Sequence, residues 1–372
     1  MGIEMLYRLF FLSIGLLTLA YVTALIILRS GLKRIRPVPK SERRIRVSVV
    51  IAARNEEAVI ADCLTALAKQ TYPQELTEIL VVDDHSTDAT AEIASGFAGV
   101  AVLKSQPTPG VAPKKAALQT GIKAAKGEII LTTDADCIAP PRWIESMAAA
   151  FDEDVDLVAS WLTVRDDGRL LSRIERLDSF AYVLIGAALF GLNRPTLANS
   201  ANMAFRRCAF FEAGGYADIG AFGSGDDDLL VQKMASRSRR QCRFVDGEIV
   251  TTASNPRWRN FFAQRLRWAS KTDAYPAALM TAEVIIYFYF FLLFISWLAA
   301  PAAPFLLVFT AVKFAADFLF LRRIKLPGFA IPLHVFLLAE IIQVLYILAV
   351  GLWANLGVYE WKGRTYRRGR LF

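Results

Sequence analysis

The chain has 372 residues, 55% of them hydrophobic, and a mean hydropathy of +0.37. This average is high for a soluble globular protein and predicts segments that enter a membrane. The net charge of +8 is interpreted as attraction to anionic lipid headgroups and a phosphorylated substrate. A nucleic-acid partner is not expected, because the sequence carries no RNA- or DNA-binding signature.

The first candidate membrane span runs from Met5 to Leu28, and it has no charge between Arg8 and Arg29. A spanning helix needs roughly 20 apolar residues, and a basic run rather than a cleavage site follows this one. We therefore expect a retained anchor over residues 1–28 and a basic juxtamembrane linker over residues 29–45. This basic run predicts an inner (cytoplasmic) membrane protein whose large domain faces the cytoplasm.

The other end of the chain carries three further apolar stretches, which predict about three membrane helices within residues 283–355. They are Val284–Ala300, Phe305–Leu321 and Phe329–Leu352. Three crossings would leave the basic tail, residues 356–372, outside the cell, against the usual charge asymmetry. Either one stretch is re-entrant or the tail breaks the rule. The four cysteines show no paired spacing, which suits reduced thiols in the cytoplasm.

Between the anchor and these stretches, residues 46–254 alternate apolar β-branched runs with helical spacing. The expected strands cover residues 46–53, 78–82, 100–103 and 127–133, and the helices between them cover 58–70, 89–95 and 114–126. This alternation predicts an α/β domain with a mostly parallel sheet and helices on both faces.

Polar clusters follow three of these strands: Asn55–Glu57, Asp83–Asp84 and Asp134–Asp136. Ligands of such sheets bind at the carboxyl ends of the strands. One cluster alone is typical of a helix cap, but three at one edge predict a binding site. The two aspartates of the third cluster offer oxygen ligands of the kind that Mg²⁺ or Mn²⁺ takes while bridging to substrate phosphates.

Six segments together resemble the family 2 glycosyltransferases, which are inverting enzymes of the GT-A fold, and the match spans about Val47 to Trp268. The segments are Val49–Glu57, Val81–Asp88, Lys114–Leu118, Thr133–Asp136, Gly225–Leu229 and Gln264–Trp268. The resemblance implies Asp136 as the direct metal ligand, with Asp134 nearer the ribose or sugar. The nucleotide-sugar site that it implies comprises Ala53, Asn55, Glu57, Asp83, Asp84, Lys114, Asp134 and Arg267.

An inverting transfer needs a base that takes the proton of the acceptor hydroxyl. The family usually shows Glu-Asp-x-Asp-Leu where this chain has Gly225-Asp-Asp-Asp-Leu229. Alignment on Asp228 makes Asp226 the base, which we favour, whereas a shift by one residue makes it Asp227. The alternative is an acidic helix start that the helix dipole favours, but the mutual repulsion of three carboxylates is easier to understand at a site.

The segment Gln264-Arg-Leu-Arg-Trp268 resembles the Gln-x-x-Arg-Trp motif of membrane-embedded members. On a helix Gln264, Arg267 and Trp268 share one face. Arg267 is expected to hold the diphosphate, and Gln264, Trp268 and Asn202 are expected on the acceptor side. The same helix, in residues 255–282, is also typical of a basic amphipathic helix lying on the membrane.

Three charged residues fall within the apolar C-terminal stretches: Lys313, Asp317 and Glu340. Intramembrane charges indicate function by default, yet a mutually paired structural role is an equal alternative for Lys313 and Asp317. A histidine-based zinc site is not expected, because the two histidines lie far apart in sequence.

Attachment to a membrane at both ends favours a lipid acceptor, with a single sugar transferred from a UDP-sugar. A GDP-sugar remains open. Two alternatives are a processive polysaccharide synthase, which usually has more spans, and an inactive membrane-bound assembly partner, which would have lost the acidic motifs.

Overall fold

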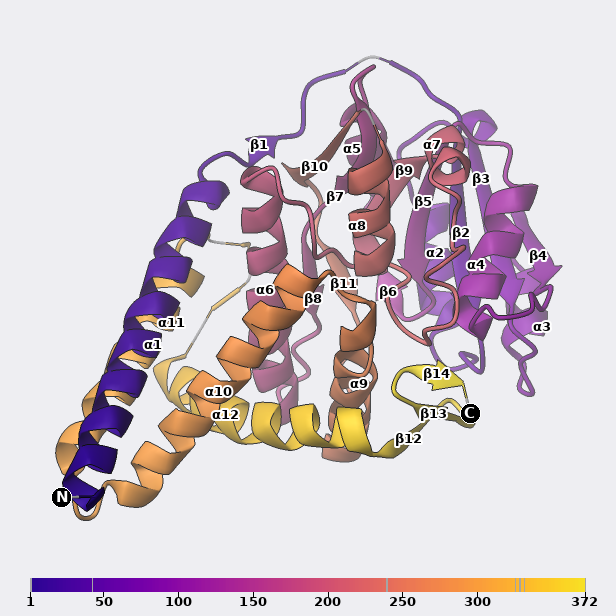
Figure 1. The fold of residues 1–372 in the computed structure, drawn as a ribbon. Helices are drawn as coiled ribbons and strands as arrows, with labels where there is room; N and C mark the ends of the chain where they lie inside the picture. Colours follow the sequence, from indigo (N-terminus) through magenta and orange to yellow (C-terminus); the bar gives the residue numbers. More distant parts are fainter. Residues whose placement is uncertain are drawn as a thin grey trace.

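The computed structural model describes residues 2–41, 43–238, 240–324, 326–327, 329–330 and 332–371. Its centre is an eight-stranded sheet of order β1-β10-β7-β9-β5-β2-β3-β4 (Figure 1). All neighbours pair in parallel except β9, which is antiparallel to both β5 and β7. The strands are β1 (Arg36–Pro37), β2 (Val47–Ala53), β3 (Thr77–Asp83), β4 (Val100–Lys104), β5 (Ile129–Asp134), β7 (Val155–Ala159), β9 (Met203–Arg206) and β10 (Gln241–Asp246).

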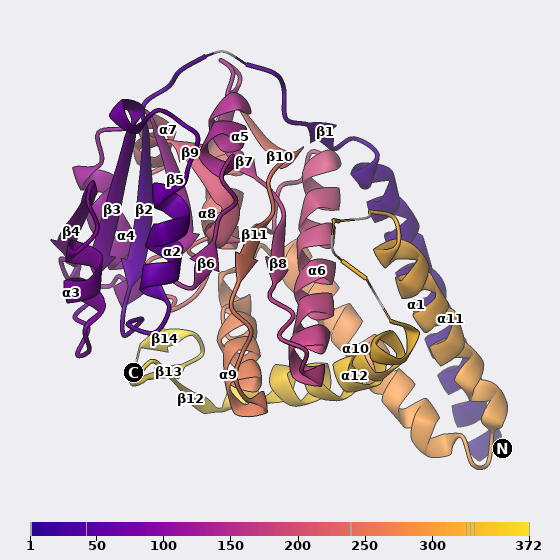
Figure 2. The ribbon, with the colours of Figure 1, turned by 180° about the vertical axis from the view of Figure 1, so that it is seen from behind.

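Helices cover both faces of this sheet, which confirms the predicted α/β class. In Figure 1 α4 and α8 lie in front of the sheet, and in Figure 2 α2 and α5 do. The helices are α2 (Ile60–Ala68), α3 (Thr90–Ser95), α4 (Pro113–Ala124), α5 (Trp143–Ala149), α6 (Leu170–Gly191), α7 (Arg207–Glu212) and α8 (Asp228–Arg237). A small sheet of order β6-β11-β8 adjoins them, formed by Cys137–Ile138, Val250–Thr252 and Leu162–Val164.

The central strands are apolar on both faces because both are covered. Val47, Val49, Val50 and Ile51 of β2 have no exposed surface, and neither have Ile129, Ile130 and Leu131 of β5. At their carboxyl ends β3 and β5 finish on Asp83 and Asp134. Because β2, β3 and β5 are parallel and in register, Ala52 pairs with Asp134 and Ala53 with Asp83. The predicted polar clusters therefore meet at one edge of the sheet.

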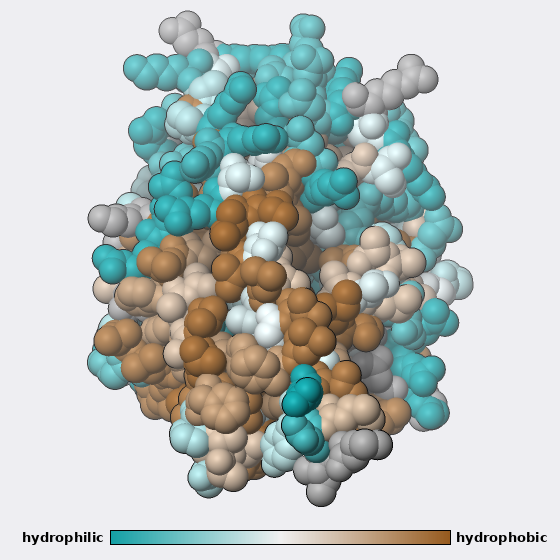
Figure 3. Space-filling model, turned by 60° about the vertical axis from the view of Figure 1, so that its left-hand side comes forward, coloured by the Kyte–Doolittle hydropathy of each residue, from teal (hydrophilic) through white to brown (hydrophobic). Residues whose placement is uncertain are grey.

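Four helices are long and apolar enough to cross a membrane within the described residues: Glu4–Leu32, Ala277–Ala299, Pro304–Leu321 and Leu333–Ala354. They belong to α1 (Gly2–Leu32), α10 (Ala277–Ala299), α11 (Leu307–Leu321) and α12 (Leu333–Leu356). Figure 3 shows a broad hydrophobic surface, with hydrophilic surface above it. Ile331, within one predicted span, lies outside the described residues.

The anchor helix α1 packs directly against the catalytic domain through α6. A Cβ at Gly31 would lie 2.1 Å from the carbonyl oxygen of Ala188, and one at Gly191 would lie 2.1 Å from that of Gly31. Neither position has space for a side chain, so glycine at both allows the two backbones to touch. The predicted linker also joins the fold, because Arg36–Pro37 pairs with β10.

The predicted basic tail is folded. Residues Val358–Trp361 (β12), Arg364–Arg367 (β13) and Arg370–Leu371 (β14) form an antiparallel sheet, here termed the C-terminal sheet. It lies beside helix α9 (Trp258–Ala269) and below the central sheet in the view of Figure 1. The C-terminal sheet contacts the catalytic domain, and α12 runs across the other apolar helices in Figures 1 and 2.

Candidate active site

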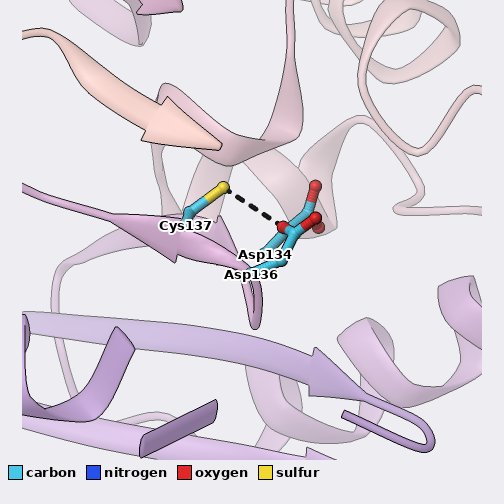
Figure 4. Close-up of side chains that lie close together, drawn as sticks. All are labelled: Asp134, Asp136 and Cys137. Carbon is cyan, nitrogen blue, oxygen red and sulfur yellow. Dashed lines mark hydrogen bonds between the residues drawn. The ribbon is translucent and has the colours of Figure 1, made fainter. Parts of the chain in front are cut away.

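The two aspartates that follow β5 lie side by side at the edge of the sheet. One ligand oxygen from each of Asp134 and Asp136, and the sulfur of Cys137, lie within 4.8 Å of one another. Figure 4 shows the two carboxylates together and the Cys137 thiol to one side, where it donates a hydrogen bond to Asp136 at 3.5 Å. Burial raises the pKa of this thiol, so the carboxylates are the ligands that the cluster presents at neutral pH.

The electrostatics of Asp136 fit a bound divalent cation. Burial, with the neighbouring carboxylates of Asp134 and Glu56, raises the pKa of Asp136 to about 6. Such a shift is that of a buried carboxylate beside other negative charges. Two half-buried carboxylates side by side, one of them paired with Lys114, suit Mg²⁺ or Mn²⁺. The residues present therefore fit the predicted metal.

Lys114, at the start of α4, joins this acidic pair to the acidic run before α8. Its Nζ lies 2.9 Å from Asp134 Oδ1 and 2.8 Å from Asp226 Oδ2. Burial by itself opposes a charged ammonium, but Asp134 and Asp226 raise the pKa of Lys114 above its usual value. A permanently charged lysine therefore holds two carboxylates from distant parts of the chain together.

The three adjacent aspartates have separate environments. Asp228 has no exposed surface, and Lys271 lies 2.5 Å from its carboxylate while Tyr275 donates a hydrogen bond at 2.6 Å. Burial opposes ionisation of Asp226, but Lys114 holds its pKa well below the ordinary value. Asp227 caps α8 by accepting from the backbone of Asp228 at 2.8 Å. Burial and its two acidic neighbours raise the pKa of Asp227 to about 7.

The predicted nucleoside pair lies at the end of β3, where both side chains are buried. Asp83 accepts a hydrogen bond from the backbone of Ser86 at 3.0 Å, which shapes the loop after the strand. The Asp84 carboxylate accepts hydrogen bonds from both terminal nitrogens of Arg364, at 2.6 and 3.3 Å. The carboxylate expected to meet the nucleoside therefore contacts the C-terminal sheet in this structure.

Three other residues of the predicted nucleotide-sugar site hold this loop. Asn55, with a positive φ of 52°, accepts from the backbone of Thr87 at 2.8 Å. Glu57 accepts from the backbone of Ala89 at 3.0 Å. Ala53 is buried at the end of β2, and its carbonyl accepts from the backbone of Asp84 at 2.8 Å. These three residues lie at the predicted edge and position its loops.

The Gln-x-x-Arg-Trp segment is helical, as predicted, and lies within α9. The side chains of Gln264, Arg267 and Trp268 contact different partners. The Arg267 guanidinium stacks 4.9 Å from the Trp361 ring and acts electrostatically on Lys114 and Asp226, so it belongs to the acidic site. Gln264 accepts from Asn255 at 3.1 Å. Trp268 stacks on Tyr182 of α6, with 6.0 Å between ring centroids.

Asn202 is almost fully enclosed. Its carbonyl oxygen accepts from the Trp143 indole at 2.8 Å, and its amide nitrogen donates to the backbone of Trp161 at 2.6 Å and Glu248 at 3.0 Å. These bonds tie β9 to its surroundings. The acceptor roles of Asn202, Gln264 and Trp268 stay predictions, and the contacts of Asn202 favour a structural role for it.

Sequence reasoning missed several residues of the site. Glu56, rather than its neighbour Glu57, contributes to the raised pKa of Asp136. Lys362 forms an ion pair with Glu56. Lys115 is buried and donates to the backbone of Ile219 at 2.6 Å. Two of these residues carried a sequence signal, because Glu56 belongs to the first polar cluster and Lys115 to the segment Lys114–Leu118. Lys362 could not be assigned, since its partner lies far away along the chain.

The match to a family model agrees with this geometry: residues 48–215 match the model for glycosyl transferase family 2. The chain therefore carries a glycosyl transferase family 2 domain over these residues. The matched segment contains β2 to β9 and both aspartates of the predicted metal pair, while the acidic run before α8 and the α9 segment follow it.

Similar proteins agree with the family. The chain is 24% identical over 278 residues to the probable glycosyltransferase YdaM of Bacillus subtilis, covering 70% of this chain and 65% of that protein. It is 30% identical over 155 residues to the dodecaprenyl-phosphate galacturonate synthase of Rhizobium johnstonii, covering 40% of this chain and 45% of that protein. The matches thus span less than two thirds of either relative.

A solved structure shows the same fold. The mannosyltransferase PcManGT from Pyrobaculum calidifontis, in complex with GDP-Man and Mn²⁺, superposes with a TM-score of 0.57 at 20% identity. The superposition covers 92% of this chain and 98% of that one. At this identity the likeness establishes the fold, the GT-A fold that the resemblance implied.

Proposed function

We propose that this glycosyltransferase transfers one sugar, with inversion, from a nucleotide-sugar to a lipid acceptor at the cytoplasmic face of the inner membrane. The observation that carries the proposal is the convergence of Asp84, Asp136 and Asp226 at one edge of the sheet, with Lys114 joining the last two clusters. Carboxylates for the nucleoside, for a metal and for a base are the set that such a transfer needs.

In this proposal each part of the donor meets its own group. Asp83 and Asp84 bind the nucleoside, and Asp134 and Asp136 hold Mn²⁺ or Mg²⁺. The metal supplies positive charge that stabilises the departing diphosphate. Arg267, which lies beside the acidic site, adds a second positive charge to that diphosphate. A UDP-sugar is the donor we favour, with a GDP-sugar as the alternative.

Asp226 is the base in this proposal. The acceptor hydroxyl oxygen attacks the anomeric carbon, its proton passes to the Asp226 carboxylate, and the bond from that carbon to the diphosphate oxygen breaks. Because Lys114 keeps its pKa low, Asp226 is ionised at neutral pH, which is the form that a base needs. Lys114 fixes the carboxylate relative to Asp134, and this reduces the reorganisation that the reaction requires.

The lipid acceptor is supported by where the site lies in the molecule. Helix α9 exposes Trp258 and Phe262 and also carries Arg267 of the acidic site. Such a helix lies at a membrane surface with its aromatic side chains among the lipids. A hydroxyl at the headgroup level would then be close to the site. The printed name of the Rhizobium johnstonii relative, a dodecaprenyl-phosphate galacturonate synthase, agrees with a lipid-linked acceptor.

For the membrane arrangement, we propose that α1 crosses once, that α10 and α11 cross as a hairpin, and that α12 lies along the cytoplasmic surface. This arrangement keeps the C-terminal sheet on the side of the catalytic domain. A reporter fused after Phe372 should then give a cytoplasmic signal in intact cells. A signal from the outside would contradict the arrangement.

A direct test supplies the purified chain in lipid nanodiscs with Mn²⁺, radiolabelled UDP- and GDP-sugars and membrane lipid extract. The proposal predicts label in an organic-soluble product that carries one sugar. Label in a long water-soluble polymer would instead favour the processive synthase. Absence of any labelled product with every donor would favour the inactive partner and contradict the proposal.

A further inference from the structure

The C-terminal sheet is firmly attached to the edge of the active site. The backbone of Gly223 donates to that of Gly369 at 2.6 Å, in the loop that leads to the acidic run. Tyr359 bonds the Ser270 hydroxyl at 2.8 Å, just after α9, and stacks on Tyr366 with centroids 5.5 Å apart. These contacts join the sheet to both flanks of the site, so its cationic side chains have defined positions.

Two cations of this sheet contact the carboxylates at the strand ends. Arg364 binds Asp84 through both terminal nitrogens. Lys362 pairs with Glu56 and donates to the backbone carbonyl of Arg54 at 3.4 Å. Asp84 is 8% exposed at its side chain, whereas Arg364 is 21% exposed and Lys362 37% exposed. The acids are fixed in the fold, and the two cations retain access to solvent.

The positions of these acids define where a diphosphate would lie. If the nucleoside meets Asp84 and a metal meets Asp136, the diphosphate must lie between them. Arg364 lies on Asp84 at one end. At the other end Lys362 and Glu56 both act electrostatically on Asp136. Arg267, stacked on Trp361 of the same sheet, is a third cation there.

We propose that the C-terminal sheet is part of the donor site, with Lys362 and Arg364 as further cations that bind the diphosphate of the nucleotide. This proposal rests on the function proposed above. In the structure both cations are paired with carboxylates. When the nucleoside occupies Asp84 and a metal neutralises the neighbouring acids, the two cations exchange those partners for phosphate oxygens. Arg364 is suited to this exchange because its planar guanidinium matches phosphate as well as carboxylate.

The same ion pairs have two alternative explanations. They could block the nucleoside site, or they could only support the loops. If Arg364 only blocked Asp84, its removal would strengthen binding of nucleotide and nucleoside alike. If the ion pairs only supported the loops, their removal would weaken both ligands equally. If the cations bind the diphosphate, their removal weakens the ligand that carries a diphosphate and does not weaken the nucleoside.

The experiment measures binding of UDP, GDP, uridine and guanosine to the full-length chain in nanodiscs with Mn²⁺, for the wild type and for Lys362→Gln/Arg364→Gln. We expect the double variant to weaken the nucleoside diphosphate by about tenfold or more, since charge-assisted hydrogen bonds are the strong ones. Affinity for the matching nucleoside should not fall by more than about threefold. Arg364→Lys keeps the charge but loses the planar guanidinium. Its affinity for the diphosphate should lie between those of the wild type and the double variant.

The matched control is Arg367→Gln, because Arg367 is an exposed cation on the same strand as Arg364. It should leave diphosphate affinity at the wild-type level. Unchanged or stronger diphosphate binding in the double variant would overturn the inference, and so would equal weakening of diphosphate and nucleoside. If the wild type itself bound neither diphosphate, the proposed function would fail, and this inference with it.

Discussion

The ammonium of Lys114 lies 2.8 Å from Oδ2 of Asp226, and the same nitrogen lies 2.9 Å from Asp134. One side chain at the start of α4 thereby connects the proposed metal pair with the proposed base. Since Asp226 is 3% exposed, the contact fixes a buried carboxylate rather than a solvated one. This arrangement has consequences that can be measured one residue at a time.

Replacing Lys114 by methionine should lower the transfer rate without unfolding the chain. The substitution keeps much of the side-chain length and removes the charge that holds Asp134 and Asp226 together. We expect kcat/KM to fall about a hundredfold, the scale of removing one preorganised charged group from an active site. Steady-state kinetics measure this, with Lys123→Met, on the exposed end of α4, as the control. Equal rates for Lys114→Met and the wild type would contradict the bridging role.

The pH profile distinguishes the two candidate bases. A base must be deprotonated to act, so a base with a raised pKa loses activity as the pH falls through that value. If Asp227 were the base, the rate at saturating metal would fall about tenfold per pH unit below about 7. Because the pKa of Asp226 is lowered, we expect no such fall from the base between neutral pH and mild acid.

Substitutions complete the same test. Asp226→Asn should lower kcat by about a hundredfold or more, whereas Asp227→Asn should retain most of the activity. Loss of activity in Asp227→Asn, together with retention in Asp226→Asn, would move the base to the neighbouring residue and leave the reaction type unchanged.

Packing of the anchor against the domain is testable at Gly31. A Cβ there would lie 2.1 Å from a backbone oxygen of α6, so Gly31→Ala must move the helices apart. Overpacking of this kind costs about 1–3 kcal/mol, measurable as a lower unfolding temperature in detergent. Gly15→Ala on the same helix is the control, because its Cβ would meet Phe309 at an ordinary 3.7 Å. Equal unfolding temperatures for the two variants would show that α1 does not pack on α6 this way.

Lys313, Asp317 and Glu340 of the apolar C-terminal helices form a buried cluster. This pairing agrees with the structural role that was one of the two alternatives for Lys313 and Asp317. Lys313 has no exposed surface and contacts Asp317 at 2.9 Å, Gln343 at 2.8 Å, and Glu340. Lys313→Met would leave two buried carboxylates without this cation, at a cost of about 3–5 kcal/mol. Arg8→Gln, which breaks an exposed pair with Glu4, should cost less than about 1 kcal/mol. Similar stability losses in thermal unfolding would contradict a structural role for Lys313.

The sequence was informative where a feature is local. Apolar runs such as residues 47–53 predicted the central strands, and the acids that follow them predicted the edge of the sheet, because parallel strands bring their carboxyl ends together. The fold class, the family and α9 are confirmed on these grounds.

Features that depend on distant partners could not be read from the chain. Nothing near Arg364 indicates that it reaches Asp84, since the pairing exists only once the C-terminal sheet has folded back onto the domain. The choice between Glu56 and Glu57 depends on which way two adjacent side chains turn after β2. Asn202 was expected on the acceptor side, but its amide group is hydrogen-bonded to the indole of Trp143 and to two backbone carbonyls.

The most direct test of the central claim is donor turnover by the purified chain in nanodiscs, with and without Mn²⁺, beside Asp136→Asn and Asp226→Asn. Nucleotide release from a UDP- or GDP-sugar, in the presence of lipid extract, should require the metal and be lost in both variants. Turnover that persisted in Asp136→Asn without metal would contradict the metal site. Failure of every donor to react or bind, even with lipid extract, would contradict the proposed transferase activity.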